Sequence, residues 1–269
     1  MPMTSTAARA DNTIFLVPPL LLRWCKEPLL YIKLMTIGCY KRICLPYQAI
    51  LSFMVSMQVF VADIHLRPSA SEEADWFISW LSGREKDAEN IYILGDLFDY
   101  WYSGIEKRFA DVLDSLRSPK IHLLPGNRDF LLCNSRLTGI DVIQSEERVI
   151  SLYGSRILLA HGHTLTEADN GFRLLHRYGW PMLKTLDQML PLALKERCAR
   201  SMVKSSAMIR PSSSRIRPGI GKEKRVDTVI CGHLHRHILT PELIVLPAFY
   251  DSRAWLAWDE KGPRLDKPG

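Results

Sequence analysis

The stretch from Val59 to Leu66 reads VFVADIHL, an apolar run that leads directly into an aspartate and a histidine. Its first residues are β-branched, aromatic or small, which is typical of a buried strand. Asp63 and His65 follow at the point where such a strand would end. We therefore predict a strand that delivers two polar ligands into the loop at its carboxyl end.

Four later segments repeat this arrangement of an apolar run followed by polar side chains. They are IYIL before Gly95-Asp96, IHLLP before Gly126-Asn127, RILLA before His161-Gly162-His163, and DTVIC before Gly232-His233-Leu234-His235. Asp and Asn also favour turns, but turn chemistry alone does not explain so many potential ligands in this order. We predict that the five strand ends complete one metal site.

The chemistry of this site follows from its donor types. Carboxylates, an amide and imidazoles without thiolates suit Mn²⁺, Fe²⁺, Zn²⁺ or Co²⁺, and the six cysteines show no CxxC spacing. Two such ions roughly 3.5 to 4 Å apart, bridged by a carboxylate, can clamp an in-line attack on phosphorus. The sequence therefore predicts two divalent metal ions, with Mn²⁺ as first choice, and hydrolysis of a phosphoester or phosphoanhydride.

The order of apolar and amphipathic segments predicts an α/β sandwich with mixed sheets flanked by helices. Helical spacing is found over Ser71–Leu81 and Ile105–Leu116, whereas Asn90–Leu94 and Ile121–Leu124 are typical of buried strands. Two further strands are predicted to form a hairpin across Tyr153-Gly154-Ser155. We predict a core at 58–164 and 226–262, with the last strands at Leu243–Leu246 and Trp255–Trp258, and a loose tail at 263–269.

Residues 165–225 are predicted to form an inserted helical cap. Apolar residues at helical spacing indicate helices broken at Pro181 and Pro191, and the stretches after Pro211 and over Arg217–Gly221 are typical of flexible linkers. Thirteen basic and five acidic side chains give this segment a net charge of +8, against +6 for the whole chain. The charge favours an anionic substrate or an anionic surface.

Residues 1–57 differ from the rest. The apolar run Ile14–Leu22 is too short to span a bilayer and contains two prolines, and no signal-peptide cleavage site follows a basic start. We expect translation to start at Met54 or Met57, which makes the preceding residues a misassigned extension. The alternative is a segment that touches a membrane.

The ordered motifs D-x-H, G-D, G-N-x-D, H-G-H and G-H-x-H resemble those of the calcineurin-like metallophosphoesterases. The resemblance runs from about Met57 to Trp258. It implies that Asp63, His65 and His235 hold one metal, that Asn127, His161 and His233 hold the other, and that Asp96 bridges them. It implies catalytic roles for Asp96, Asn127, Arg128 and His233, while Asp99 and Asp129 are expected to orient the backbone and the ligands.

Arg128 limits the resemblance to a part of the family, because most members carry a histidine at this position. An arginine remains charged and grips phosphate with a fork of donors, which suits a diphosphate substrate. The chain is similar to one branch of the family, the pyrophosphohydrolases that cleave UDP-2,3-diacylglucosamine to lipid X and UMP in lipid A biosynthesis. The resemblance is carried by the motifs LGDLFDYW and GNRDFLL and by the basic cap. This resemblance implies substrate contacts from Asn127, Arg128, His163, Phe172, Ser205, Ser206 and Arg210.

The same resemblance implies a nucleotide-linked glycolipid as partner and a cytoplasmic monomer that lies peripherally on the inner membrane face. Two alternatives remain. One is a metallophosphoesterase acting on another nucleotide or phosphodiester, and the other is a scaffold without enzymatic activity. A nucleic acid is not expected, since the cap alternates basic residues with Leu and Met rather than with aromatic residues that stack on bases.

Overall fold

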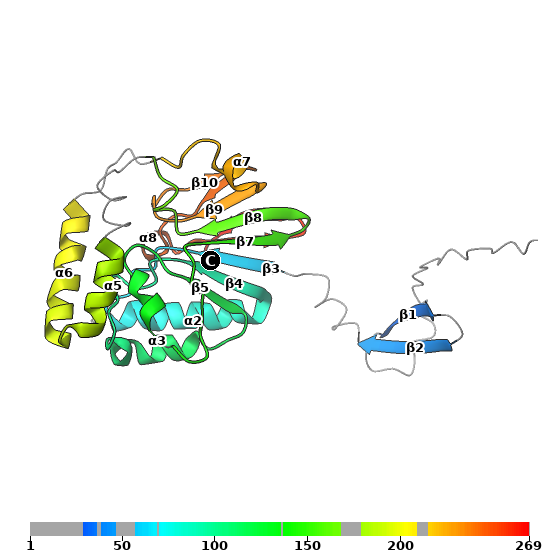
Figure 1. The fold of residues 1–269 in the computed structure, drawn as a ribbon. Helices are drawn as coiled ribbons and strands as arrows, with labels where there is room; N and C mark the ends of the chain where they lie inside the picture. Colours follow the sequence, from blue (N-terminus) through cyan, green and yellow to red (C-terminus); the bar gives the residue numbers. More distant parts are fainter. Residues whose placement is uncertain are drawn as a thin grey trace, which may run out of the picture. The chain divides into compact units, whose positions relative to one another are not determined.

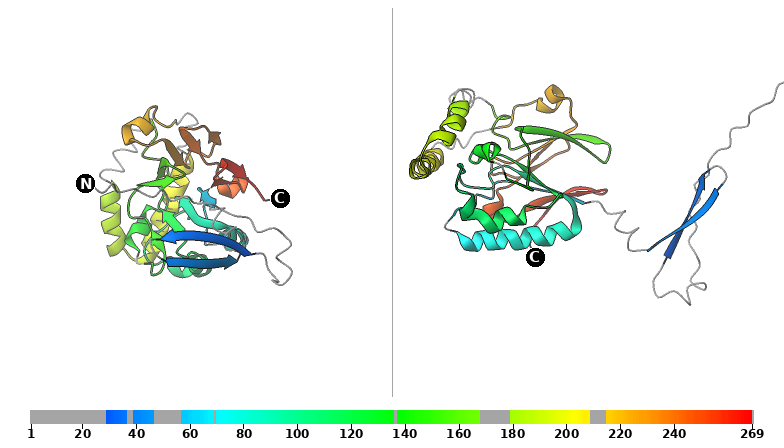
Figure 2. Two further views of the ribbon diagram at one scale, coloured as in Figure 1. Left: turned by 90° about the vertical axis from the view of Figure 1, so that its right-hand side faces the viewer. Right: turned by 60° about the horizontal axis from the view of Figure 1, so that its bottom comes forward.

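The computed structural model describes residues 29–36, 39–46, 57–68, 70–135, 137–167, 179–208 and 215–268. The chain divides into two compact units, Met1–Ser56 and Met57–Gly269. In the first unit, β1 (Leu29–Thr36) and β2 (Cys39–Pro46) form an antiparallel pair. In the second unit, two sheets lie face to face with helices outside them (Figures 1 and 2).

The six-stranded sheet has the order β13-β12-β3-β4-β5-β6, with β3, β4, β5 and β6 parallel. Its strands are β3 (Met57–Val61), β4 (Ala88–Leu94), β5 (Ile121–Leu124), β6 (Asp141–Val142), β12 (Trp255–Asp259) and β13 (Gly262–Asp266). The run that opens at Val59 is fully buried in this sheet. Its outer face is covered by α2 (Ser71–Asp87), η2 (Glu106–Phe109) and α3 (Ala110–Ser115).

The five-stranded sheet has the order β10-β11-β9-β8-β7. Its strands are β7 (Glu147–Leu152), β8 (Ser155–Ala160), β9 (Thr228–Cys231), β10 (Ile238–Leu239) and β11 (Leu243–Val245). Tyr153 and Gly154 both have positive φ and join β7 to β8 in the predicted hairpin. Phe60, Leu94, Leu159, Ile230 and Leu256 meet between the two sheets, which confirms the predicted sandwich of mixed sheets.

Three short helices lie near strand ends: η3 (Phe130–Asn134), α7 (Ile220–Lys224) and α8 (Phe249–Ser252). The cap helices α5 (Trp180–Met189) and α6 (Leu192–Met208) stand together at one end of the sandwich (Figure 1). Pro191 separates these two helices, as predicted, and Pro181 lies in the first turn of α5. A proline is well suited to the first turn, where its missing N–H has no partner to lose. The helix predicted before Pro181 lies outside the described residues, so a break at this position stays a prediction.

The linker predicted over Arg217–Gly221 is wrong. Ile216 pairs with Thr166 in a β-bridge, and Ile220 opens α7 and is buried on the outer face of the five-stranded sheet. Arg217 N–H donates to Leu165 O at 2.9 Å, so the two ends of the insertion are joined at its base. The part of the cap region from 215 to 225 therefore packs on the core.

The loose tail predicted at 263–269 is also wrong over most of its length. Gly262–Asp266 forms β13, an edge strand paired antiparallel with β12. Asp259 starts the turn by accepting from Lys261 N–H at 2.8 Å, and its other oxygen pairs with Arg264 at 2.5 Å. Because an edge strand buries little apolar surface, its sequence lacks the period of a core strand.

Candidate metal centre

The predicted ligands follow the strands in the way that the sequence suggests. Asp63 and His65 follow β3, Asp96 follows β4, Asn127 follows β5, His161 follows β8, and His233 and His235 follow β9. The loops after these strands are hydrogen-bonded to one another. Asp63 N–H donates to Gly95 O at 3.1 Å, and Gly232 N–H donates to His161 O at 2.8 Å. Sequence-distant ligands are thereby brought to one place.

Five of these residues have backbone φ in the left-handed region, which non-glycine residues rarely adopt. They are Asp63, His65, Asp96, His233 and His235, with φ from 52° to 67°. Such conformations each cost of the order of 1 to 3 kcal/mol and persist where surrounding structure enforces them. Their concentration here indicates a functional site.

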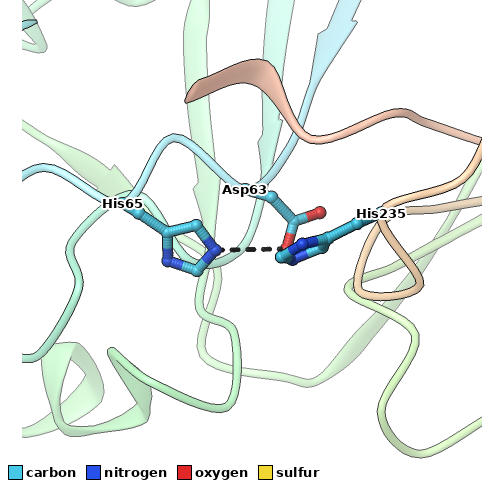
Figure 3. A group of neighbouring side chains, drawn as sticks. All are labelled: Asp63, His65 and His235. Carbon is cyan, nitrogen blue, oxygen red and sulfur yellow. Dashed lines mark hydrogen bonds and ion pairs between the residues drawn. The ribbon is translucent and has the colours of Figure 1, made fainter. Parts of the chain in front are cut away.

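The side chains form two groups that could each hold a metal. One group is Asp63, His65 and His235, and the other is Asp63, Asp96 and His161, with ligand atoms within 4.8 Å of one another in each group. Figure 3 shows the imidazoles of His65 and His235 on either side of the Asp63 carboxylate. His235 Nε2 lies 3.1 Å and His65 Nε2 lies 3.8 Å from Asp63 Oδ1.

The remaining two ligands lie against the second group. Asn127 Oδ1 is 3.0 Å from His161 Nε2, and the His233 ring is 5.1 Å from that of His161. His233 N–H also donates to Asp63 Oδ2 at 2.9 Å. All seven predicted ligands are therefore neighbours. The two groups share Asp63, whereas the resemblance gives the bridging role to Asp96, so that role stays a prediction.

The buried imidazoles and carboxylates fit a divalent cation. Neither ring nitrogen of His65 has a hydrogen-bond partner among the described residues, although both are buried, and a metal would supply a partner to one of them. Burial lowers the pKa of His65, which keeps its imidazole neutral and able to ligate. Burial and the nearby His161 lower the pKa of His233 to about 4, with the same consequence.

His161 behaves differently because of the carboxylate beside it. Burial alone would lower its pKa, but Asp96, whose Oδ2 lies 3.5 Å from Nε2, outweighs burial and raises the pKa to about 9. The same pair works against the burial of Asp96 and holds the pKa of that carboxyl well below its ordinary range. His161 Nδ1–H donates to Leu94 O at 2.8 Å, which leaves Nε2 to face the centre.

We expect metal affinity to rise with pH because of His161. Below pH 9 the His161 imidazole of the metal-free protein is cationic and carries a second ring proton, on Nε2. An incoming metal cation must displace this proton. The affinity for Mn²⁺ should therefore increase up to about tenfold per pH unit between pH 7 and 9 and then level off. Calorimetric titrations in buffers of different ionisation enthalpy measure the affinity and the proton released. An affinity independent of pH over this range would contradict the expectation.

Asp99 and Asp129 orient neighbouring groups, as predicted. Asp99 Oδ1 accepts from Arg128 Nη1–H and lies 3.7 Å from His65 Nδ1. Asp129 is fully buried and accepts from Gly126 N–H and Phe98 N–H. Burial and the nearby Asp96 raise the pKa of Asp129 to about 7. Arg128 is thus directed toward the centre, with Nε 3.8 Å from Asp96 Oδ2.

Gly126 allows the third loop to approach Asp96 closely. A Cβ at this position would lie 2.2 Å from Asp96 Oδ1 and 2.5 Å from Asp96 N. We expect Gly126→Ala to lower the unfolding free energy by about 2 to 3 kcal/mol, since a packed backbone must shift. Gly83→Ala is the matched control, because Gly83 lies in α2 with no atom within 4 Å of a Cβ. It should raise stability by about 0.5 to 1 kcal/mol. Denaturant unfolding of both variants tests the pair.

The other predicted substrate contacts stay predictions. His163 is buried, with its ring 5.5 Å from that of His161 and 5.3 Å from that of Trp180. Phe172 and Arg210 lie outside the described residues, and Ser205 and Ser206 lie on α6, where their side chains are not described. Tyr250 was missed by sequence reasoning. Its ring lies 5.3 Å from that of His65 and 5.8 Å from that of His235, and no motif marks it.

A family model described as calcineurin-like phosphoesterase matches residues 58–237, which hold all seven predicted ligands. The chain belongs to the calcineurin-like phosphoesterase family. This membership, together with the relatives described next, makes it a metal-dependent hydrolase.

Curated relatives carry a more specific name. The chain is 31% identical to proteins named UDP-2,3-diacylglucosamine hydrolase from Photorhabdus laumondii and from Escherichia coli strain K12, over 66% of this chain and 81% of each relative. Among solved structures, a predicted phosphoesterase from Streptococcus pneumoniae is similar with a TM-score of 0.35 and 14% identity, covering 79% of this chain and 88% of that one.

Proposed function

We propose that this phosphoesterase hydrolyses UDP-2,3-diacylglucosamine to UMP and 2,3-diacylglucosamine 1-phosphate, which is lipid X. A cavity of about 180 Å³ beside the centre supports this substrate. Asn127 and Arg128 form part of its wall, and the rest is mainly apolar. A phosphate with an attached apolar group is the ligand that such a wall suits.

The core and the cap each supply one apolar side of this cavity. From the core come Trp101, Tyr102 and Leu131, and from the cap come Leu183, Leu186 and Leu190. The stacked rings of Phe130 and Trp180, 4.2 Å apart, join η3 to the start of α5. Acyl chains placed between the two sides would leave water for apolar contacts, which favours binding in proportion to the area buried.

In the proposed reaction, water attacks the phosphorus next to uridine, and the bond from this phosphorus to the bridging oxygen breaks. Two divalent cations held by the seven ligands would supply an acidified water and neutralise phosphate charge. Arg128 would hold the diphosphate with its guanidinium, directed by Asp99. The leaving group is a phosphate ester that needs charge neutralisation more than a proton, which suits an arginine at this position.

We further propose that the cap rests on the membrane that holds the substrate. Four large apolar side chains of the cap are exposed, namely Met182, Met189, Leu192 and Leu194, and Met189 is 75% exposed. Among the described residues, no helix is long and apolar enough to cross a bilayer. These exposed apolar side chains would instead insert into the membrane interface. Co-sedimentation with anionic vesicles tests this contact, and Met189→Gln should weaken it.

The decisive experiment compares three substrates in detergent with Mn²⁺: UDP-2,3-diacylglucosamine, UDP-N-acetylglucosamine and an aryl phosphodiester. UMP release from the diacyl substrate alone is the expected result. Cleavage of the aryl phosphodiester alone would support the proposed metal chemistry but would contradict the proposed lipid substrate. The same assay with Zn²⁺, Fe²⁺ and Co²⁺ identifies the preferred metal.

A further inference from the structure

A buried ionic cluster joins the cap to the core at the wall of the apolar cavity. Asp187 on α5 accepts from Ser103 N–H at 3.0 Å and from Ser103 Oγ–H at 2.5 Å. Lys195 on α6 lies with Nζ 3.7 Å from Asp187 Oδ1 and donates to Ser103 O at 3.1 Å. Three segments that are far apart in the sequence therefore meet in one set of polar contacts.

The cluster is almost completely removed from solvent. The side chain of Asp187 is 2% exposed and that of Lys195 is 9% exposed. Moving two charges out of water is costly, and a buried ion pair is therefore weak evidence for stability by itself. Its fixed geometry is more informative, because both carboxylate oxygens of Asp187 are engaged by Ser103. Such a cluster permits one relative position of its three segments.

That position determines the shape of the cavity. Asp187 and Lys195 line it, as do Leu183 and Leu186 from the same helix as Asp187 and Leu190 from the residue that follows this helix. Leu183 and Leu186 are three residues apart and so lie on one face of α5. A rotation or shift of α5 would move both of them relative to the core side of the cavity.

We propose that Asp187, with Ser103 and Lys195, is a positioning residue that holds the cap over the core and so sets the affinity for acyl chains. The proposal rests on the proposed function for its substrate, but the anchoring of the cap is a property of the protein alone. The hydrogen bonds and the ion pair of Asp187 are with Ser103 and Lys195, so its effect on hydrolysis is indirect.

The test is Asp187→Asn, which keeps the shape of the side chain and leaves Lys195 without its charged partner. The KM for UDP-2,3-diacylglucosamine should rise by about 10- to 100-fold while kcat stays within about threefold, as expected when binding of the ground state and of the transition state is weakened equally. Hydrogen exchange followed by mass spectrometry should show faster exchange in α5 and α6. Ser103→Ala removes one hydrogen-bond donor to Asp187, so it should raise KM and the rate of hydrogen exchange by a smaller amount. This variant tests the proposal if Asp187→Asn does not fold.

Arg108→Ala is the matched control. Arg108 also joins the core to α6, through a two-point contact with Glu196 at 2.8 and 3.0 Å, but its side chain is 44% exposed. Exposed pairs contribute little, so KM and cap exchange should remain those of the wild type. An unchanged KM in Asp187→Asn, or a fall in kcat with unchanged KM, would overturn the proposal.

The two proposals fail in different ways. If the wild-type protein does not cleave the diacyl substrate, the proposed function is wrong. Hydrogen exchange in the cap helices and binding of a fluorescent fatty-acyl probe then still test whether Asp187 anchors the cap. If the wild type cleaves it and Asp187→Asn shows normal cap exchange and normal probe binding, the anchor falls and the function stands.

Discussion

Asp96→Ala is expected to reduce metal-dependent hydrolysis by about four orders of magnitude, equivalent to about 5 to 6 kcal/mol of transition-state free energy. The carboxylate is buried within the second group of predicted ligands, and its Oδ2 lies 3.5 Å from His161 Nε2. It also accepts from Arg128 N–H at 2.9 Å. Its removal takes away a ligand, an electrostatic partner of His161 and the contact that orders the third loop. Release of UMP from UDP-2,3-diacylglucosamine with Mn²⁺ measures the effect.

Metal content separates the possible causes of this loss. Elemental analysis should show less than the wild-type amount of metal in Asp96→Ala, because a carboxylate is removed from the centre. Asp259→Asn is the matched control, since Asp259 pairs with Arg264 at the turn between β12 and β13, outside both groups of ligands. It should keep wild-type metal content and activity. Wild-type activity in Asp96→Ala would remove this residue from the centre.

Arg128→Ala is expected to lower kcat/KM for the diphosphate substrate by about 10²- to 10³-fold while metal content stays unchanged. Loss of a charge-assisted contact to phosphate in a site shielded from water has an effect of this size, about 3 to 4 kcal/mol. The Arg128 side chain is only 11% exposed, and its guanidinium is held by Asp99. Steady-state kinetics on UDP-2,3-diacylglucosamine, together with elemental analysis, measures both quantities.

Arg128→Lys refines the result. A lysine keeps the charge but not the planar fork, so we expect it to recover only part of the activity. Arg148→Ala controls for the loss of a positive charge, because Arg148 is an exposed partner of Asp141, 3.8 Å away on the edge strands. Activity of Arg128→Ala near that of wild type would remove the diphosphate contact from the mechanism.

The parts of the fold with a strong periodic signal could be predicted from sequence. The buried runs before Asp63, Asp96 and His161 form β3, β4 and β8, because a continuous apolar run of this length is compatible with few other structures. The hairpin turn at Tyr153-Gly154 was also predictable from its turn residues. Two segments were predicted wrongly. The edge strand β13 and the short helix α7 bury little surface, so neither needs a regular pattern.

The sequence by itself predicted the set of seven ligands, and it determined their order along the chain and the chemistry of their donor atoms. These features are local, since each predicted ligand follows directly after one of five strands. Only the tertiary structure decided the relations between them. Asp63 belongs to both groups, the pKa of His161 is raised beside Asp96, and the ring of Tyr250 lies near that of His65. The contact of Asp187 with Ser103 joins residues 84 positions apart, and no local pattern encodes such a distance. Burial and charge proximity depend on how the two sheets and the cap pack, and that packing exists only in the folded chain.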